Sequence, residues 1–251
     1  MQRITRGVTY CTTGACNPPA ARVKVGETVQ VETELCTGDW LRSIEDTYRP
    51  GIGFGPNPAS GPLYVEGAEP GMALAVRLEA IELDSLGYTG SGPGANPFPD
   101  WVRQREWGVL TRTVRICEGF IEWGNGLRLP VQPMVGLIGT APAREVLLNS
   151  RPGPHGGNLD VQEVAPGATI HLPVYVPGAL LHLGDVHARM GDGEICCGGG
   201  TECRGVVTLT IAGLYPRPRR MTWPRLENAS HIMTVGCARP AEDAFRIAVQ
   251  E

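Results

Sequence analysis

Three segments of the chain share one pattern, in which a glycine in a turn precedes side chains that alternate between apolar and polar. Gly26 precedes residues 28–35, Gly71 precedes residues 73–83, and Gly167 precedes residues 169–176. Alternation with a period of two gives a strand one buried and one exposed face, which is typical of antiparallel sheets. Residues 206–214 (VVTLTIAGL) predict a fourth strand. The chain is therefore expected to be mainly β.

Helical segments are expected to be few and short. The 34 glycines and 22 prolines among 251 residues leave little room for long helices, whereas 42% hydrophobic residues are enough for a real core. The best helical segment begins at Pro240 and carries Glu242 and Asp243 at its positive end. The predicted fold class is an antiparallel, β-sandwich-like architecture with few short helices, one of them at the C-terminus.

The domain prediction is one domain over residues 1–251. The Gly/Pro-rich segment 87–100 reads as a loop. If that loop is a boundary, the alternative is two β lobes of about 1–100 and 101–251.

Charge and composition exclude several classes of protein. A net charge of −4 argues against a nucleic-acid partner, and no apolar run approaches the roughly 18 residues of a membrane span. The start of the chain lacks the apolar core of a signal peptide, so we expect a cytoplasmic protein with reduced thiols. The single lysine, Lys24, lies in a strand–turn segment, which argues against amidase sites that need a lysine beside a serine or cysteine nucleophile.

Histidines and acids are concentrated in two glycine-rich segments between residues 155 and 202. Asp185 and His187 are two residues apart in an extended segment, so their side chains should lie on the same side. A turn at residues 191–194 then presents Glu194 nearby, and the HGGNLD segment adds His155 and Asp160. Carboxylates with imidazoles suit a divalent ion, of which zinc with an open position is the usual hydrolytic choice.

Simpler interpretations of these segments remain open. The turn at 191–194 is also what an ordinary hairpin would use, and HGG is also an ordinary glycine turn before a strand. Cys196, Cys197 and Cys203 could form a zinc knuckle with a nearby histidine. A cysteine nucleophile with His187 as its base is a further alternative.

Four longer blocks, residues 57–74, 131–142, 155–194 and 224–236, closely resemble the acetamidase/formamidase family in sequence and in order. The resemblance implies a mainly β fold and the metal-associated hydrolysis of short aliphatic amides to a carboxylate and ammonia. It also implies a small amide substrate and a homo-oligomer. The early strand departs from the family's pattern, since Leu35 stands where members often carry an acid and Asp39 is a candidate replacement. Relatives also usually continue beyond the position of Glu251 into a longer helical segment.

The resulting hypothesis is a metal-dependent hydrolase of short linear carboxamides of the formamide or acetamide type. Its metal is expected to be zinc, with calcium as the alternative. We expect Asp160, Asp185 and His187 to bind it and Glu194 to be the general base. The remaining assignments are a catalytic role for His155, which would hold the substrate or the oxyanion, and substrate binding by Gly156, Gly157 and Asn158.

Two other functions stay in view. One is a decayed β module that only binds a metal or a small ligand. The other is a hydrolase of a larger or cyclic amide, admitted by the Cys- and Gly-rich segment 195–203.

Overall fold

The computed structural model describes residues 1–48, 57–91, 110–192, 194 and 200–251. Its early strands are β1 (Gln2–Ile4), β2 (Thr9–Tyr10), β3 (Thr12–Thr13), β4 (Ala21–Val23), β5 (Thr28–Glu32), β6 (Ala59–Val65) and β7 (Met72–Ser91). The middle of the chain forms β8 (Leu110–Cys117), β9 (Phe120–Gly124), β10 (Leu127–Pro130), β11 (Met134–Gly139), β12 (Leu147–Leu148) and β13 (Gly156–Asn158). The last elements are β14 (Thr169–Pro173), β15 (Leu181–Met190), β16 (Gly200–Pro216), β17 (Arg225–Glu227), β18 (Ile232–Thr234) and helix α2 (Ala241–Gln250).

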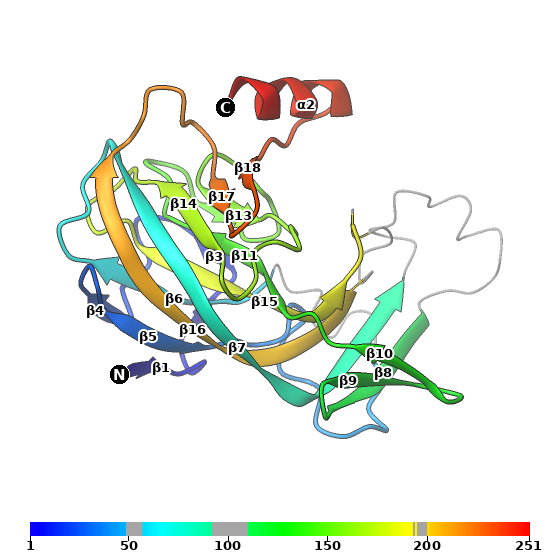
Figure 1. Cartoon of the computed structure of the whole chain (residues 1–251). Helices are drawn as coiled ribbons and strands as arrows, with labels where there is room; N and C mark the ends of the chain where they lie inside the picture. The colour runs from blue at the N-terminus through cyan, green and yellow to red at the C-terminus, as the bar shows by residue number, and fades with distance from the viewer. Residues whose placement is uncertain (49–56, 92–109, 193, 195–199) are drawn as a thin grey trace.

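The fold is mainly antiparallel β, as the alternating segments predict. One sheet of 16 strands contains the order β10-β9-β8-β7-β16-β15-β11-β13, and β3 and β12 form a second, two-stranded sheet. Among the described residues, β1 with β5 and β4 with β6 are parallel pairs, and the other strand pairs are antiparallel. The long strands β7 and β16 cross the molecule side by side, with β8, β9 and β10 at one end (Figure 1).

Each repeated glycine turn leads into a strand of this sheet. Gly26, Gly71 and Gly167 have φ of +86°, +93° and +93°, backbone conformations that residues with a side chain rarely adopt. They precede β5, β7 and β14, whose apolar sets are buried as predicted, for example Val29 and Val31 in β5.

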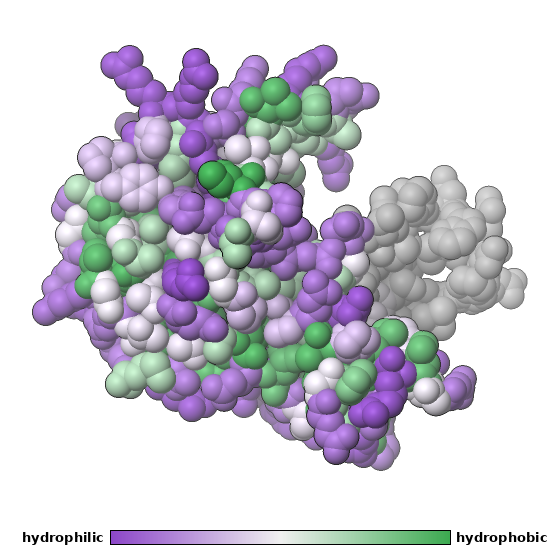
Figure 2. Space-filling view, in the orientation of Figure 1, coloured by the Kyte–Doolittle hydropathy of each residue, from purple (hydrophilic) through white to green (hydrophobic). Residues whose placement is uncertain are grey.

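The C-terminal helix is confirmed at Ala241–Gln250, with Pro240 as its N-cap residue. It lies against the end of the molecule that holds β17 and β18 (Figure 1). Its Phe245 and Val249 are exposed, and hydrophobic surface is visible in that region (Figure 2). None of its residues is buried, so α2 contributes little to the core.

One prediction of local structure is wrong in part. Residues 87–91 continue β7 and pair with β8, because the cross-strand hydrogen bonds extend the strand beyond the Gly-Tyr step. The rest of the expected loop and the alternative lobe boundary near residue 100 lie outside the described residues. No helix in the described part of the chain is long and apolar enough to cross a membrane.

Candidate active site

Two neighbouring strands bring the central acids and the histidine together. Asp185 and His187 lie in β15, and β16 places Glu202 directly opposite His187 in the antiparallel register. The Nε2 atom of His187 is 3.0 Å from Glu202 Oε2 and 3.5 Å from Asp185 Oδ1. All three residues are buried. The prediction that Asp185 and His187 face the same side is confirmed.

Asp160 reaches this group from the segment that follows β13. One ligand atom each from Asp160, Asp185 and His187 lie within 4.8 Å of one another. Asp160 and Asp185 both have left-handed backbones, with φ of +47° and +55°. Such strain is found at sites where the surroundings force a side chain into place.

Gly136 in β11 permits the close approach of the two aspartates. A Cβ atom at this position would lie 2.5 Å from Asp160 Oδ1 and 3.0 Å from Asp185 Oδ2. The backbone oxygen of Gly136 also accepts hydrogen bonds from the N–H groups of Leu159 and Asp160, at 2.9 and 3.2 Å. The missing side chain is therefore part of what brings β15 and the segment after β13 together.

Glu194 approaches the cluster from the segment that follows β15. Its backbone N–H donates to Gly191 O at 3.2 Å, the hydrogen bond expected of the predicted turn, although residue 193 of that turn lies outside the described residues. The carboxylate lies 3.9 Å from His187 Nε2 and forms a second group within 4.8 Å together with His187 and Glu202. Its side chain is 18% exposed, compared with 0% for His187 and 5% for Glu202. Glu194 is thus more accessible to solvent than His187 and Glu202.

The charges of this cluster are poorly compensated by the protein alone. Burial, followed by the nearby charge of Asp185, raises the pKa of Asp160 well above its ordinary value. Burial likewise raises the pKa of Glu202 to about 8, although His187 opposes this. Burial alone would lower the pKa of His187, but Glu202 and Asp185 outweigh it and raise that pKa. The arrangement favours an added positive charge.

Several polar atoms of the cluster are buried and lack a hydrogen-bond partner. They are Asp160 Oδ1, Asp185 Oδ1, Glu202 Oε2 and both ring nitrogens of His187. His187 Nε2 lies within ion-pair distance of Asp185 Oδ1 and Glu202 Oε2, at 3.5 and 3.0 Å. Leaving such atoms unpaired is costly unless something binds them. Oxygen and imidazole donors at this spacing fit a divalent ion.

Two asparagines connect the aspartates to each other. Asn57 donates from Nδ2 to Asn158 Oδ1 at 2.6 Å and to Asp185 Oδ2 at 3.0 Å. Asn158 in turn donates from its own Nδ2 to Asp160 Oδ2. Each aspartate thus has one oxygen held by an amide and the other, Oδ1, free of hydrogen bonds. In the described structure, Asn158 positions Asp160.

The structure does not bring His155 into the cluster. His155 is buried in the turn before β13, and the charge that acts on its pKa is that of Glu145, not of any cluster member. Burial lowers its pKa to about 4, so it is neutral at physiological pH. The groups of possible ligands around Asp185 do not include it. Its assignment as the oxyanion-holding residue stays a prediction.

Gly156 and Gly157 are required by the protein's own backbone. Both have positive φ, and a Cβ atom would lie 2.3 Å from Ile138 O at Gly156 and 2.3 Å from Arg151 O at Gly157. They pair with β11 and so fix where Asp160 leaves β13. Their proposed contact with substrate stays a prediction.

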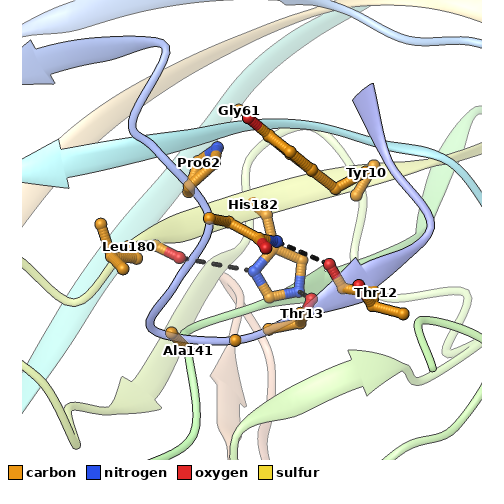
Figure 3. A pocket seen from close by; sticks show the side chains of 11 residues that line it. Tyr10, Thr12, Thr13, Gly61, Pro62, Ala141, Leu180 and His182 are labelled. Carbon is orange, nitrogen blue, oxygen red and sulfur yellow. Dashed lines mark hydrogen bonds between the residues drawn. The ribbon is translucent and has the colours of Figure 1, made fainter. Parts of the chain in front are cut away.

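His182, on the same strand as His187, belongs to a different environment. It lines a small cavity of about 10 Å³ near Thr13, Ala141 and Leu180 (Figure 3). Its Nε2 lies 2.7 Å from Thr13 Oγ1, which donates to Asn149 Oδ1 at 2.7 Å. Burial lowers the pKa of His182 to about 3. A neutral histidine with these partners is a structural component of the core.

Other residues that the sequence analysis considered for the site lie away from the cluster. Lys24 is exposed, with its Nζ 4.0 Å from Glu66, so it cannot serve the site. Asp39 does not replace the early acid, because it is exposed and pairs with Arg42 and Arg204. Cys203 is buried and points its thiol toward Val186 O. Cys196 and Cys197 lie outside the described residues.

The sequence analysis did not include among the expected ligands three residues that the structure brings to the site, namely Glu202, Asn57 and Cys36. Glu202 could have been found from the β15–β16 hairpin, because the register places it opposite His187. Asn57 and Cys36 offered no local signal, since each reaches the site from a distant part of the chain.

Comparison with known proteins identifies the family. Residues 149–215 match the model of the acetamidase/formamidase family. The chain is 38% identical to an acetamidase of Bacillus halodurans of known structure, with a TM-score of 0.86 over 96% of this chain and 80% of that one. It is 32% identical to a predicted acetamidase/formamidase of Thermoanaerobacter tengcongensis, with a TM-score of 0.87 over 99% of this chain and 80% of that one.

A relative known from its sequence supports the same family. The chain is 38% identical over 261 residues to a formamidase of Methylophilus methylotrophus, covering 77% of this chain and 61% of that protein. The chain spans about three fifths of the length of the curated relatives that it matches. On these similarities in sequence and fold, the chain belongs to the acetamidase/formamidase family.

Proposed function

We propose that this protein hydrolyses short linear carboxamides of the formamide or acetamide type to the carboxylate and ammonia, with the help of a divalent metal ion. The related acetamidase and formamidase, named above, support the amide chemistry. The observation that carries the metal is the buried set of closely spaced ligand atoms without hydrogen-bond partners on Asp160, Asp185, His187 and Glu202.

The donor set also argues for a metal on chemical grounds. An amide is a weak electrophile, and among the described residues the sole lysine is remote from the cluster. A divalent ion, when bound, polarises the amide carbonyl and lowers the pKa of its water to about 7. Asp160, Asp185 and His187 would hold it, and Glu202 adjoins His187 as a further donor.

We assign the general base to Glu194, and two observations support this. Its partial exposure lets it meet a substrate and a water, and its distance of 3.9 Å from His187 keeps it at the edge of the ligand set. In the proposed reaction, water adds to the carbonyl carbon and the C–N bond breaks. Glu194 accepts the water proton and passes it to the leaving nitrogen, which gives the carboxylic acid and ammonia. The acid then loses its proton to ammonia or to solvent, so the final products are the carboxylate and ammonium.

The metal is proposed to be zinc. Catalytic zinc sites have three protein ligands, often with histidine among them, and leave one position open for water or substrate. Calcium remains the alternative for a site rich in carboxylates. The proposal also keeps the expected homo-oligomer, which light scattering coupled to size exclusion would test.

The decisive experiment combines ammonia release with elemental analysis. Purified protein, never exposed to chelator, is assayed with formamide, acetamide, longer amides and a lactam. We expect near-stoichiometric zinc and the highest turnover with the shortest linear amides. Turnover of the lactam alone would favour the cyclic-amide function. Metal without turnover on any amide would favour a decayed binding module, and absence of any divalent ion would refute the metal.

A further inference from the structure

Cys36 lies at the edge of the carboxylate cluster although no pattern in the sequence pointed to it. The residue follows β5, which pairs with β16, and just beyond the paired residues the Thr33 N–H donates to Gly205 O at 2.8 Å. The chain then turns at residues 35–38, closed by the N–H of Gly38 on Leu35 O at 2.9 Å. This turn presents the thiol of Cys36 toward Asp185 and Glu202.

The geometry is that of a set of metal ligands. The Sγ atom of Cys36 and one carboxylate oxygen each of Asp185 and Glu202 all lie within 4.8 Å of one another. The two acids are 3% and 4% exposed, and Asp185 Oδ1 and Glu202 Oε2 have no hydrogen-bond partner. A thiol has one weak donor proton, which could satisfy only one of the two oxygens. A cation would satisfy both and would also bind the sulfur.

The surroundings of Cys36 can donate protons toward its sulfur. Trp40 Nε1–H, which can only donate, gives its hydrogen bond to Thr37 Oγ1 at 2.8 Å. The hydroxyl of Thr37 is then available to Tyr88 Oη at 2.8 Å, and the hydroxyl of Tyr88 to Cys36 Sγ at 3.1 Å. A chain of donors that ends on a ligand atom fixes the orientation of that atom.

An aromatic cluster makes this arrangement rigid. Trp40 packs edge-on against Tyr88 with ring centroids 5.0 Å apart, and Tyr48 stacks on Tyr88 at 5.9 Å. These side chains form a small core of their own with Leu35 and Leu41. The thiol is therefore attached to a fixed structure and not to a free loop.

From this geometry we propose that Cys36, Asp185 and Glu202 form a thiolate-containing position for a divalent zinc ion. Asp185 also belongs to the Asp160–Asp185–His187 set, so this position adjoins the one described above. A thiolate favours zinc and its soft analogues and disfavours calcium and magnesium. The inference rests on the proposed metal-dependent function, and it favours zinc over calcium as the metal of that function.

The test uses the whole protein, stripped of metal and titrated with cadmium. Thiolate binding gives a sulfur-to-cadmium charge-transfer absorption in the ultraviolet, which carboxylates and histidine do not produce. We expect this absorption in the parent protein, its loss in Cys36→Ser, and its retention in Cys203→Ala. Cys203 is the matched control, because it is buried in β16 but belongs to none of the ligand groups of the described residues. Zinc affinity of Cys36→Ser should fall by roughly 10-fold or more.

X-ray absorption at the zinc edge keeps the test valid if Cys36→Ser does not fold. The parent zinc protein should show a sulfur neighbour at about 2.3 Å. Zinc with only nitrogen and oxygen neighbours would overturn the inference, and so would an undiminished cadmium band in a folded Cys36→Ser. If the bands behave as expected but no amide is hydrolysed, the inference stands and the proposed activity fails. Trapping of an acylated Cys36 during turnover would instead identify a nucleophile and refute the ligand role.

Discussion

Gly136→Ala should separate metal binding from folding at this site. The added methyl would lie 2.5 Å from Asp160 Oδ1 and 3.0 Å from both Asp185 O and Asp185 Oδ2. Ordinary contacts begin at 3.4 Å, so relief requires Asp160 Oδ1 to move by about 0.9 Å, the difference between 3.4 and 2.5 Å. Zinc ligand distances tolerate only about 0.2 Å.

The strain can be relieved in two ways, and both lower metal affinity. If the carboxylate of Asp160 rotates away, the fold is spared but a proposed ligand is lost. If β11 shifts, Asp185 is displaced as well, and overpacking costs about 1–3 kcal/mol of the free energy of unfolding. We expect a fall of roughly 10–100-fold in zinc affinity, with kcat/KM at limiting zinc falling in parallel.

The assay is competition for zinc against a chromophoric chelator, with thermal unfolding measured in excess zinc and in EDTA. Gly213→Ala in β16 is the matched control, because its methyl would meet no atom within 4 Å. The reasoning is refuted if Gly136→Ala binds zinc as tightly as the parent protein and hydrolyses amides equally fast. That result would mean that Asp160 and Asp185 do not hold one ion together.

Three further predictions follow from the same structure. Glu194→Gln should retain zinc and the fold while kcat for ammonia release falls by roughly 10²–10⁴, since an amide cannot accept the proton; loss of zinc would make Glu194 a ligand. His182 has a folded pKa of about 3, below its ordinary 6.5, so its contribution to stability is complete above pH 6.5 and is lost as the pH falls toward 3. Between pH 8 and pH 5, the free energy of unfolding measured with urea should therefore fall by about 2 kcal/mol less in His182→Gln than in the parent protein. An equal fall in both proteins would contradict the assignment. Arg204→Met should lower the free energy of unfolding by roughly 3–5 kcal/mol, because it leaves Glu34 buried without its partner. Adding Glu34→Gln should recover much of that loss in the same urea experiment, and no recovery would exclude the ion pair as the cause.

The strands and half of the site were accessible from the sequence because their signals are local. Alternation after Gly26, Gly71 and Gly167 predicts strands that the structure confirms, since side-chain direction in a strand depends only on the parity of the position. The same parity places Asp185 and His187 on one side of β15. The glycine-rich segment after β15 is likewise a local signal, and the structure places Glu194 3.9 Å from His187, with its N–H bonded to Gly191 O.

The rest of the site depends on register and on long-range contacts, for which the sequence has no local signal. The β15–β16 register puts Glu202 opposite His187, and the same packing leaves His155 outside the group. Asn57 and Cys36 join from segments about 130 and 150 residues earlier in the chain than Asp185. Periodicity therefore determined which faces are buried. Only the tertiary structure determined which buried polar side chains meet in one cluster. Their meeting depends on the register of the sheet and on the absence of a side chain at Gly136, and neither has a local signal in the sequence.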